Sequence, residues 1–270
     1  MPYTDVNGLR FHYEDDDFTD PWNGPETVFI QHGWGRSTEF FYHWVPRLAN
    51  KYRVIRRDMR GHGLSEDPPV GKPWTVEELV SDMVGFFDAL NLDKVHYIGE
   101  SAGGVLGVAL AASHPERLRS LTVMSAPLTD PTRNSESYGY TDLAEVVLST
   151  PMERVLDMLI KGRGVVPISA AHERWMRQEW EKNRPESLAA LTRLFPDVDL
   201  SPLLPDFKVP TLILAPANSQ TAPLDEQKRM HKLLSNSRME IIDGSGHEIY
   251  FERFEECMAA VQSFLALNDD

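Results

Sequence analysis

The chain has 270 residues, 41% of them hydrophobic, which is enough for the core of one large domain or of a domain that carries an insertion. Its 41 acidic and 27 basic residues give a formal net charge of −14, which argues against nucleic acid or an anionic membrane as the partner. No run approaches the ~18 apolar residues of a membrane span, and the polar start is unlike a signal peptide. The single cysteine, Cys257, excludes an internal disulfide, and we expect a reducing, cytoplasmic location.

Short β-branched runs alternate with helical stretches along most of the sequence. Such alternation predicts an α/β fold, with a mostly parallel sheet and helices on both of its faces. The later strands read as near-continuous apolar runs, as strands buried on both faces do. The expected strands are 9–14, 27–31, 53–58, 95–99, 121–125, 211–215 and 239–243, and the expected helices are 39–50, 76–90, 102–114, 226–234 and 252–266.

The segment 128–205 interrupts this alternation because it contains helical patterns and no clear strand. Prolines lie near both of its ends. We therefore expect residues 1–127 and 206–270 to form the core, and residues 128–205 to form a helical insertion between two of its strands. The helical patterns fall at 142–149, 153–161, 170–182 and 185–194.

The stretch "YIGESAGG" places Ser101 between Gly99 and Gly103, directly after one apolar run and before another. Gly-x-Ser-x-Gly between a strand and a helix is typical of a nucleophile elbow, a tight turn that exposes the serine hydroxyl at the carboxyl end of the sheet. Glycines two residues before and after the serine let the strand and the helix approach closely. The pattern predicts that Ser101 is a catalytic nucleophile.

Four blocks in order resemble the α/β-hydrolase superfamily: "FIQHGWGRS", "RRDMRGHGLSEDP", "IGESAGG" and "IIDGSGHEIYFERFEE". The resemblance covers nearly the whole chain. It implies an α/β-hydrolase fold, with an eight-stranded, mostly parallel sheet and the insertion 128–205 acting as a cap. It also implies a capped serine esterase or lactonase that needs no cofactor. The scattered histidines and the single cysteine offer no metal-ligand spacing.

The resemblance assigns further roles around the serine. The backbone N–H groups of Trp34 and Ala102 would form the oxyanion hole, which stabilises the negative oxygen of acyl transfer. His247, in a loop after the last predicted strand, would be the general base. His32 and His62 would shape loops.

The acid that usually orients the histidine is missing from both of its family positions, which hold Ser219 and Ser125. Three explanations stay open. Asp130 or Asp225 reaches His247 from elsewhere in the chain, a neutral Ser219 or Asn218 takes the place of the acid, or the protein does not hydrolyse its ligand.

The insertion carries aromatic and sulfur-containing side chains that fit a pocket for an apolar or aromatic ligand, and Trp175 and Met176, together with the indole of Trp34, are the candidates to line it. The function we expect is hydrolysis of a small apolar carboxylic ester or lactone, by a monomer or a homodimer. One alternative is cofactor-free dioxygenase-like chemistry, in which the histidine deprotonates a phenolic substrate. The other is a ligand-binding protein whose catalytic site has lost its activity.

Overall fold

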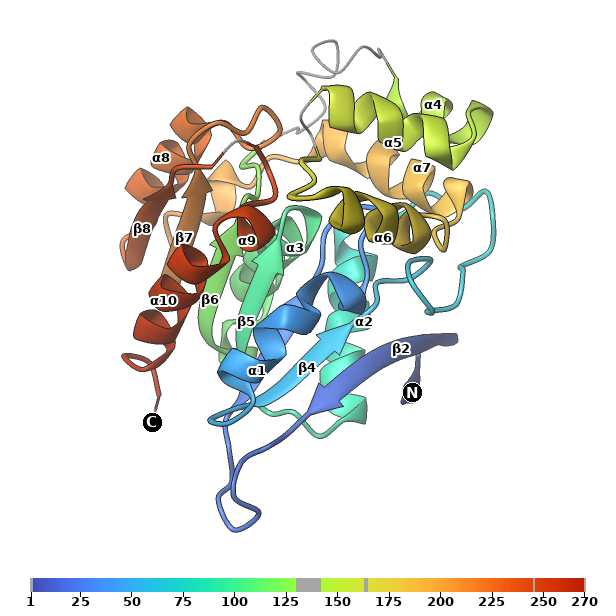
Figure 1. Ribbon diagram of the computed structural model, residues 1–270. Helices are drawn as coiled ribbons and strands as arrows, with labels where there is room; N and C mark the ends of the chain where they lie inside the picture. The colour runs from blue at the N-terminus through green and yellow to red at the C-terminus, as the bar shows by residue number, and fades with distance from the viewer. Residues whose placement is uncertain (1, 130–141, 163–164, 245, 270) are drawn as a thin grey trace.

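The computed structural model describes residues 2–129, 142–162, 165–244 and 246–269. Its strands form one eight-stranded sheet in the order β1-β2-β4-β3-β5-β6-β7-β8 (Figure 1). The pairs β1–β2 and β2–β4 are antiparallel, and the other neighbours are parallel, so the sheet is mostly parallel, as the sequence predicts. The strands are β1 (Tyr3–Val6), β2 (Leu9–Asp16), β3 (Thr27–Gln31), β4 (Arg53–Arg57), β5 (Val95–Glu100), β6 (Leu118–Met124), β7 (Thr211–Pro216) and β8 (Ser237–Ile242).

Helices cover both faces of this sheet (Figure 1). On one face, α2, α3 and α8 share an apolar cluster with Phe29 and Tyr97. On the other, α1, α9 and α10 share a cluster with Val28 and Ile30. Neighbouring residues of β3 thus enter opposite layers, because successive strand side chains point to opposite faces. These helices are α1 (Val45–Leu48), α2 (Val76–Ala89), α3 (Ala102–Ser113), α8 (Leu224–Leu233), α9 (Ile249–Glu252) and α10 (Phe254–Leu265).

In the described residues between β6 and β7, four α-helices gather above the carboxyl ends of the parallel strands (Figure 1). The described residues between those strands add no strand to the sheet, and an isolated bridge joins Thr129 to Asp199. Capping side chains start two of the helices: Asp142 accepts from Glu145 N at 3.0 Å, and Ser169 accepts from His172 N at 3.1 Å. We call residues 142–205 the helical insert; its helices are α4 (Leu143–Ser149), α5 (Met152–Lys161), α6 (Ala170–Trp180) and α7 (Pro185–Leu194).

Several elements differ from the sequence prediction. Strand β1 was not expected, because it is a short and largely exposed edge strand. The expected helix 39–50 is a 3₁₀ helix, η1 (Thr38–Trp44), followed by α1, which begins afresh with Pro46 in its first turn. The expected helix 252–266 divides into α9 and α10. Strand β8 is only half buried, because it forms the edge of the sheet and has one neighbouring strand.

The position of Cys257 agrees with a smaller expectation from the sequence. Cys257 is buried in α10, where burial raises the pKa of its thiol to about 12, so it acts as a small apolar residue. No helix in the described ranges combines the length and the apolar character of a membrane span.

The junction of β5 and α3 depends on glycines that allow backbone segments to touch. A β-carbon on Gly99 would lie 2.6 Å from the carbonyl carbon of Gly103, and one on Gly103 would lie 2.7 Å from the carbonyl oxygen of His32. These neighbours are main-chain atoms of β3, its following loop and α3, so they cannot rotate away. The strand, the helix and the loop after β3 therefore meet only if these positions lack side chains.

We expect Gly103→Ala to lower the free energy of unfolding by about 1–3 kcal/mol, because the added methyl group overlaps backbone atoms, although alanine favours helix more than glycine does. Urea denaturation measures the change. Gly24→Ala is the matched control, since a β-carbon there meets no atom within 4 Å. Equal stability of the two variants would contradict the close approach described above.

Candidate active site

Ser101 lies at the turn between β5 and α3 in a conformation that few non-glycine residues adopt. Its φ is +50° and its ψ is −118°. The turn is held by hydrogen bonds from Ser101 N to Met124 O at 2.9 Å and from Gly104 N to Ser101 O at 2.9 Å. A backbone strained in this way, at the carboxyl end of a parallel sheet, is the geometry of a nucleophile elbow. The sequence prediction for the position of Ser101 in the fold therefore agrees with the structure.

The loop after β3 lies against this elbow. The N–H of Gly33 donates to Oε2 of Glu100 at 2.8 Å, and a β-carbon on Gly33 would lie 2.8 Å from the β-carbon of Ser101. His32 connects this loop to the residues after β4, because its Nε2 accepts from Met59 N at 2.9 Å. Its Nδ1 therefore carries the proton and donates to Gly33 O at 2.8 Å. Burial lowers the pKa of His32 to about 3, so the ring is neutral and structural.

Two backbone N–H groups at this junction have no acceptor within the described part of the chain, namely those of Trp34 and Ala102. Both residues line the cavity that contains Ser101. A buried N–H is normally paired, so two unpaired donors beside a strained serine are available to a ligand oxygen. The indole Nε1 of Trp34 is not available to a ligand oxygen, because it donates to Leu188 O of α7 at 3.0 Å.

His247 lies in the loop between β8 and α9, and hydroxyl groups hold it at two points. Its Nδ1 is 2.9 Å from Oγ of Ser219, which also accepts from Ala222 N at 3.0 Å. Its backbone oxygen accepts from Oγ of Ser125 at 2.8 Å. Both family positions for the acid thus contact His247 through neutral groups.

The alternative carboxylates do not take the place of these hydroxyls in the described structure. Asp225 is exposed in the first turn of α8, and Nδ1 of His247 is bonded to Ser219 instead. Asn218 donates to Gly244 O at 2.7 Å and so fixes the loop rather than the imidazole ring. Asp130 lies outside the described residues.

The other ring nitrogen of His247 faces Glu100. The distance from Nε2 to Oε1 of Glu100 is 3.6 Å, and both side chains line the cavity with Ser101. Within the described residues, the Ser101 hydroxyl is not hydrogen bonded to the ring. Burial, reinforced by the Arg36 guanidinium, lowers the pKa of His247 to about 3, so the imidazole is neutral at physiological pH. Burial raises the pKa of Glu100 to about 7, even though Arg36 favours its ionised form.

A buried cluster around Arg36 forms one wall of the cavity. Its Nη2 donates to Oε1 of Glu248 at 2.6 Å, and its Nε donates to Tyr250 Oη at 3.2 Å. Burial lowers the pKa of the Arg36 guanidinium, but Glu248, Tyr250 and Glu100 together outweigh burial and raise the pKa above its ordinary value. The guanidinium also lies 4.9 Å from the ring centre of Trp180. The positive charge of Arg36 is thus matched within the protein.

The cavity has a volume of about 90 Å³, below the roughly 300 Å³ at which pockets for drug-sized ligands begin. Trp175 and Met176, the expected pocket residues, do not line it. Met176 is fully buried in the core, and Trp175 packs against Phe40 at 4.9 Å between ring centres. The turn of α6 that follows supplies Trp180 instead. The apolar walls are Pro127, Leu143, Leu159, Val165, Trp180 and Phe195.

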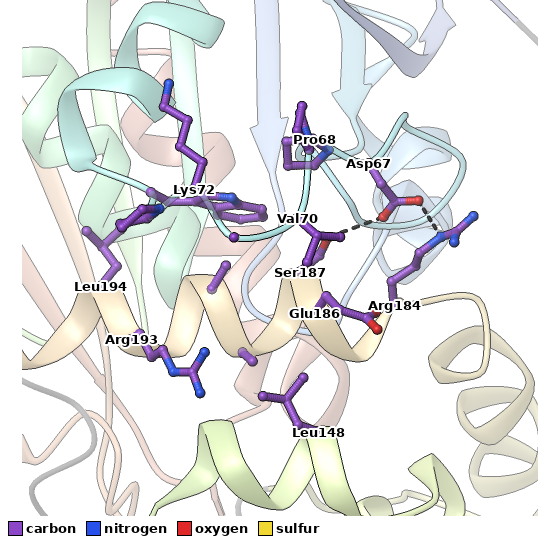
Figure 2. A pocket seen from close by; sticks show the side chains of 16 residues that line it. Asp67, Pro68, Val70, Lys72, Leu148, Arg184, Glu186, Ser187, Arg193 and Leu194 are labelled. Atoms are coloured by element: carbon purple, nitrogen blue, oxygen red, sulfur yellow. Dashed lines mark hydrogen bonds and ion pairs between the residues drawn. The ribbon is translucent and has the colours of Figure 1, made fainter.

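A larger groove, of about 420 Å³, lies on the other side of α7 between that helix and the loop 67–74. Figure 2 shows Asp67 at its rim, between Ser187 and Arg184. Asp67 accepts from Ser187 at 3.2 Å and pairs with Arg184, so these groups attach the loop to α7. Ser101 and His247 are not among the residues that line this groove, and we assign the chemistry to the smaller cavity.

Among the described residues, one group of side chains has the spacing for a metal ion: Glu26, His96 and Asp269. It lies at the amino ends of the parallel strands, opposite the edge that bears Ser101. Both carboxylates already face cations, since Glu26 pairs with Arg119 and Asp269 with Lys51. This group has no part in the chemistry at Ser101.

Sequence reasoning missed three charged members of the site. Arg36 stands inside the "HGWGRS" block, Glu100 stands inside "GESAG", and Glu248 follows the histidine directly. A signal was present, because each is a charged residue inside a block that carries the family resemblance. Their spacing in the sequence does not show which of these charged side chains contact one another.

Comparison with known proteins agrees with this arrangement. A sequence model described as the alpha/beta hydrolase fold matches residues 26–151. The 2-hydroxy-6-oxo-2,4-heptadienoate hydrolase of Pseudomonas putida is 29% identical over 263 residues, which span 90% of each chain. A Caulobacter vibrioides protein named "Putative carbamate hydrolase RutD" is 30% identical over 267 residues, 96% of each chain.

Among solved structures, the enol-lactonase of Burkholderia xenovorans LB400 superposes with a TM-score of 0.86 at 26% identity. The match covers 98% of this chain and all of the enol-lactonase chain. The shared fold, the elbow and the full-length similarity to these hydrolases lead to one assignment. The chain belongs to the α/β-hydrolase fold family.

Proposed function

We propose that the protein is a serine hydrolase that cleaves a small, uncharged carboxylic ester or lactone in the cavity beneath the helical insert. The observation that carries the proposal is the meeting of four groups in one cavity: the elbow serine, two unpaired backbone N–H groups and a neutral histidine. The names of the similar proteins, all hydrolases or a lactonase, support the reaction class. The insert 142–205 then acts as the cap that excludes bulk water.

In the proposed reaction, Oγ of Ser101 attacks the substrate carbonyl while its proton passes to Nε2 of His247. The N–H groups of Trp34 and Ala102 donate to the oxygen that becomes negative. When the tetrahedral intermediate collapses, the carbon–oxygen bond to the leaving alkoxide breaks, and Nε2 returns the proton to that alkoxide. Water repeats the sequence on the acyl-enzyme and releases the acid.

The role of Ser219 in this scheme is to hold the histidine ring. When Nδ1–H donates to Ser219 Oγ, the lone pair of Nε2 is free to take the serine proton. The hydroxyl supplies orientation without charge, so it does not stabilise the imidazolium that forms. We therefore expect slower turnover than a carboxylate at this position would give.

The cavity also favours an uncharged substrate. Arg36 is the one cation that lines it among the described residues, and its charge is matched by Glu248. Glu100 adds a carboxylate on the same wall. An anionic substrate would therefore be desolvated without a free cation to receive it.

The first prediction concerns the nucleophile. Ser101→Ala removes the attacking oxygen, and we expect turnover of short aryl esters to fall by at least about 10³-fold while the fold is kept. A fluorophosphonate probe should label the native protein and not the variant, because labelling needs an activated serine.

Near-native turnover by Ser101→Ala would contradict covalent catalysis. Activity that requires oxygen, tested by assay under argon, would instead indicate the dioxygenase-like alternative. Native protein that binds esters yet resists the probe would indicate a binding protein.

The second prediction concerns the neutral partner of His247. Ser219→Asp places a carboxylate where it can accept from Nδ1–H and from the N–H of Ala222, and we expect turnover to rise by about 10- to 100-fold. Ser219→Asn is the matched control, because it has the same size without the charge. Initial rates at saturating ester measure both.

An equal effect of the Asp and Asn variants would show that charge at this position does not limit the reaction. Asp225→Ala should leave turnover nearly unchanged, because the Asp225 side chain is exposed and His247 bonds to Ser219. A loss of activity in that variant would assign the role of the acid to Asp225.

The third prediction concerns substrate charge. We expect kcat/KM for a short neutral aryl ester to exceed that for the same ester bearing a terminal carboxylate by at least about tenfold, because Arg36, the one cation among the described residues that line the cavity, is matched by Glu248. Paired assays at constant ionic strength measure the ratio. A preference for the carboxylate would show that Arg36 leaves Glu248 to bind substrate.

A further inference from the structure

The carboxylate of Glu100 has two distinct contacts. Its side chain is about 2% exposed, and its Oε2 accepts from Gly33 N at 2.8 Å, which ties it to the loop that carries Trp34. Its Oε1 faces Nε2 of His247 at 3.6 Å. A residue that directly precedes the elbow serine is thus placed beside the nitrogen that would receive the serine proton.

The charges around His247 leave Glu100 as the counter-ion for an imidazolium. Ser219, on the Nδ1 side, is neutral. Glu248 is committed to Arg36, to which it is hydrogen bonded at 2.6 Å. Among the described residues that line the cavity, Glu100 is the carboxylate without such a cationic partner.

We propose that Glu100 is a positioning residue that supplies, on the Nε2 side of His247, the negative charge that Ser219 does not supply on the Nδ1 side. The inference rests on the proposed function, because it assigns to Glu100 the stabilisation of the charged histidine in that reaction. In a triad this charge comes from an acid bonded to Nδ1. Here the orienting hydrogen bond and the compensating charge come from different residues.

The distance suits this division of roles. At 3.6 Å, Oε1 is beyond hydrogen-bond range, so Glu100 leaves the lone pair of Nε2 to the proton of Ser101. Two unit charges at that separation in a buried site still interact strongly. Glu100 takes no proton at any step; the proton moves from Oγ of Ser101 to Nε2 and then to the leaving group.

The protonation of Glu100 adds a pH dependence. Its pKa is raised to about 7, mainly by burial, with Glu248 adding to the rise and with Arg36 and the N–H of Gly33 opposing it. Tyr250 and the neutral His247 are the other titratable groups around it. Below this pKa, the protonated carboxyl carries no charge and does not stabilise the imidazolium. Turnover should therefore rise with pH through about 7, because the ionised carboxylate is the active form. His247 titrates near pH 3 and cannot produce that limb.

The test compares Glu100→Gln and Glu100→Asp with native protein on a short neutral aryl ester. Glutamine keeps an acceptor for the Gly33 N–H and removes the charge. We expect kcat to fall by about 10- to 100-fold with KM within about threefold, and the limb near pH 7 to disappear. Glu100→Asp retains a carboxylate, so its turnover should still rise with pH. Glu26→Gln is the matched control, because it changes the same functional group at the opposite end of the strands, and we expect native kinetics.

A second arm separates a charge effect from a packing effect. Ser219→Asp restores a negative charge on the Nδ1 side, so it should raise the activity of Glu100→Gln by a larger factor than it raises that of the native protein. Equal factors in the two backgrounds would overturn the inference. So would unchanged or increased kcat in Glu100→Gln, or a pH limb that persists in it.

Labelling of the native protein by the fluorophosphonate probe distinguishes this outcome from failure of the proposed function. If native Ser101 labels and Ser101→Ala is inactive while the Glu100 variants behave as native, the hydrolase stands and the role of Glu100 is wrong. If native protein is neither labelled nor active, both are wrong. Should Glu100→Gln fail to fold, Glu100→Asp decides, because withdrawing the carboxylate by one methylene should lower kcat while turnover still rises with pH. A native kcat in Glu100→Asp would overturn the inference.

Discussion

The site depends on the close approach of three backbone segments: the end of β5, the start of α3 and the loop after β3. Each would be blocked by a β-carbon, at Gly99, Gly103 or Gly33 respectively. Their contact forces Ser101 into a left-handed conformation, whose strain the surrounding sheet must hold. It also places Trp34 and Ala102, whose N–H groups have no acceptor within the described residues, beside the same cavity. Without these three glycines, the serine and its donors would not share a cavity.

The same approach explains how buried charge is tolerated here. Glu100 is buried beside the elbow because the N–H of Gly33 satisfies one of its oxygens. Arg36 is buried on the other side of the loop because Glu248 and Tyr250 accept its hydrogen bonds. The result is a wall of charged groups in which Arg36 and Glu248 form an ion pair and Glu100 is held by a backbone N–H. Ser219 is neutral at a position where the family usually has an acid, so no fourth charge joins those of Arg36, Glu100 and Glu248.

The helical insert is fastened to the core through the site itself. Trp34 Nε1 donates to Leu188 O, and the N–H of Val166 donates to Oε2 of Glu248 at 3.2 Å. Arg36 lies against Trp180 of α6. A movement of the insert would therefore disturb the loop after β3 and the Arg36 cluster together, because it is hydrogen bonded to both.

Much of the architecture follows from local sequence. Alternating apolar strands and helices determine the sheet, and the glycine spacing around Ser101 determines the elbow, because both patterns express short-range geometry. The sequence could also predict that Ser219 holds a family position for the acid, because Ser219 follows β7. The helix boundaries at 39–50 and 252–266 were less well predicted, because tight 3₁₀ turns and short breaks leave little trace in periodicity.

The tertiary structure alone decided which polar groups meet. Nδ1 of His247 contacts Ser219, and its Nε2 faces Glu100. Arg36 is matched by Glu248. These contacts depend on side-chain rotations and, in some cases, on segments more than 100 residues apart in the sequence. Likewise Trp180 rather than Trp175 lines the cavity, since the direction of a helix face is set by what it packs against. Sequence spacing describes a helix or a strand, but the charge balance of a site arises only where several of them converge.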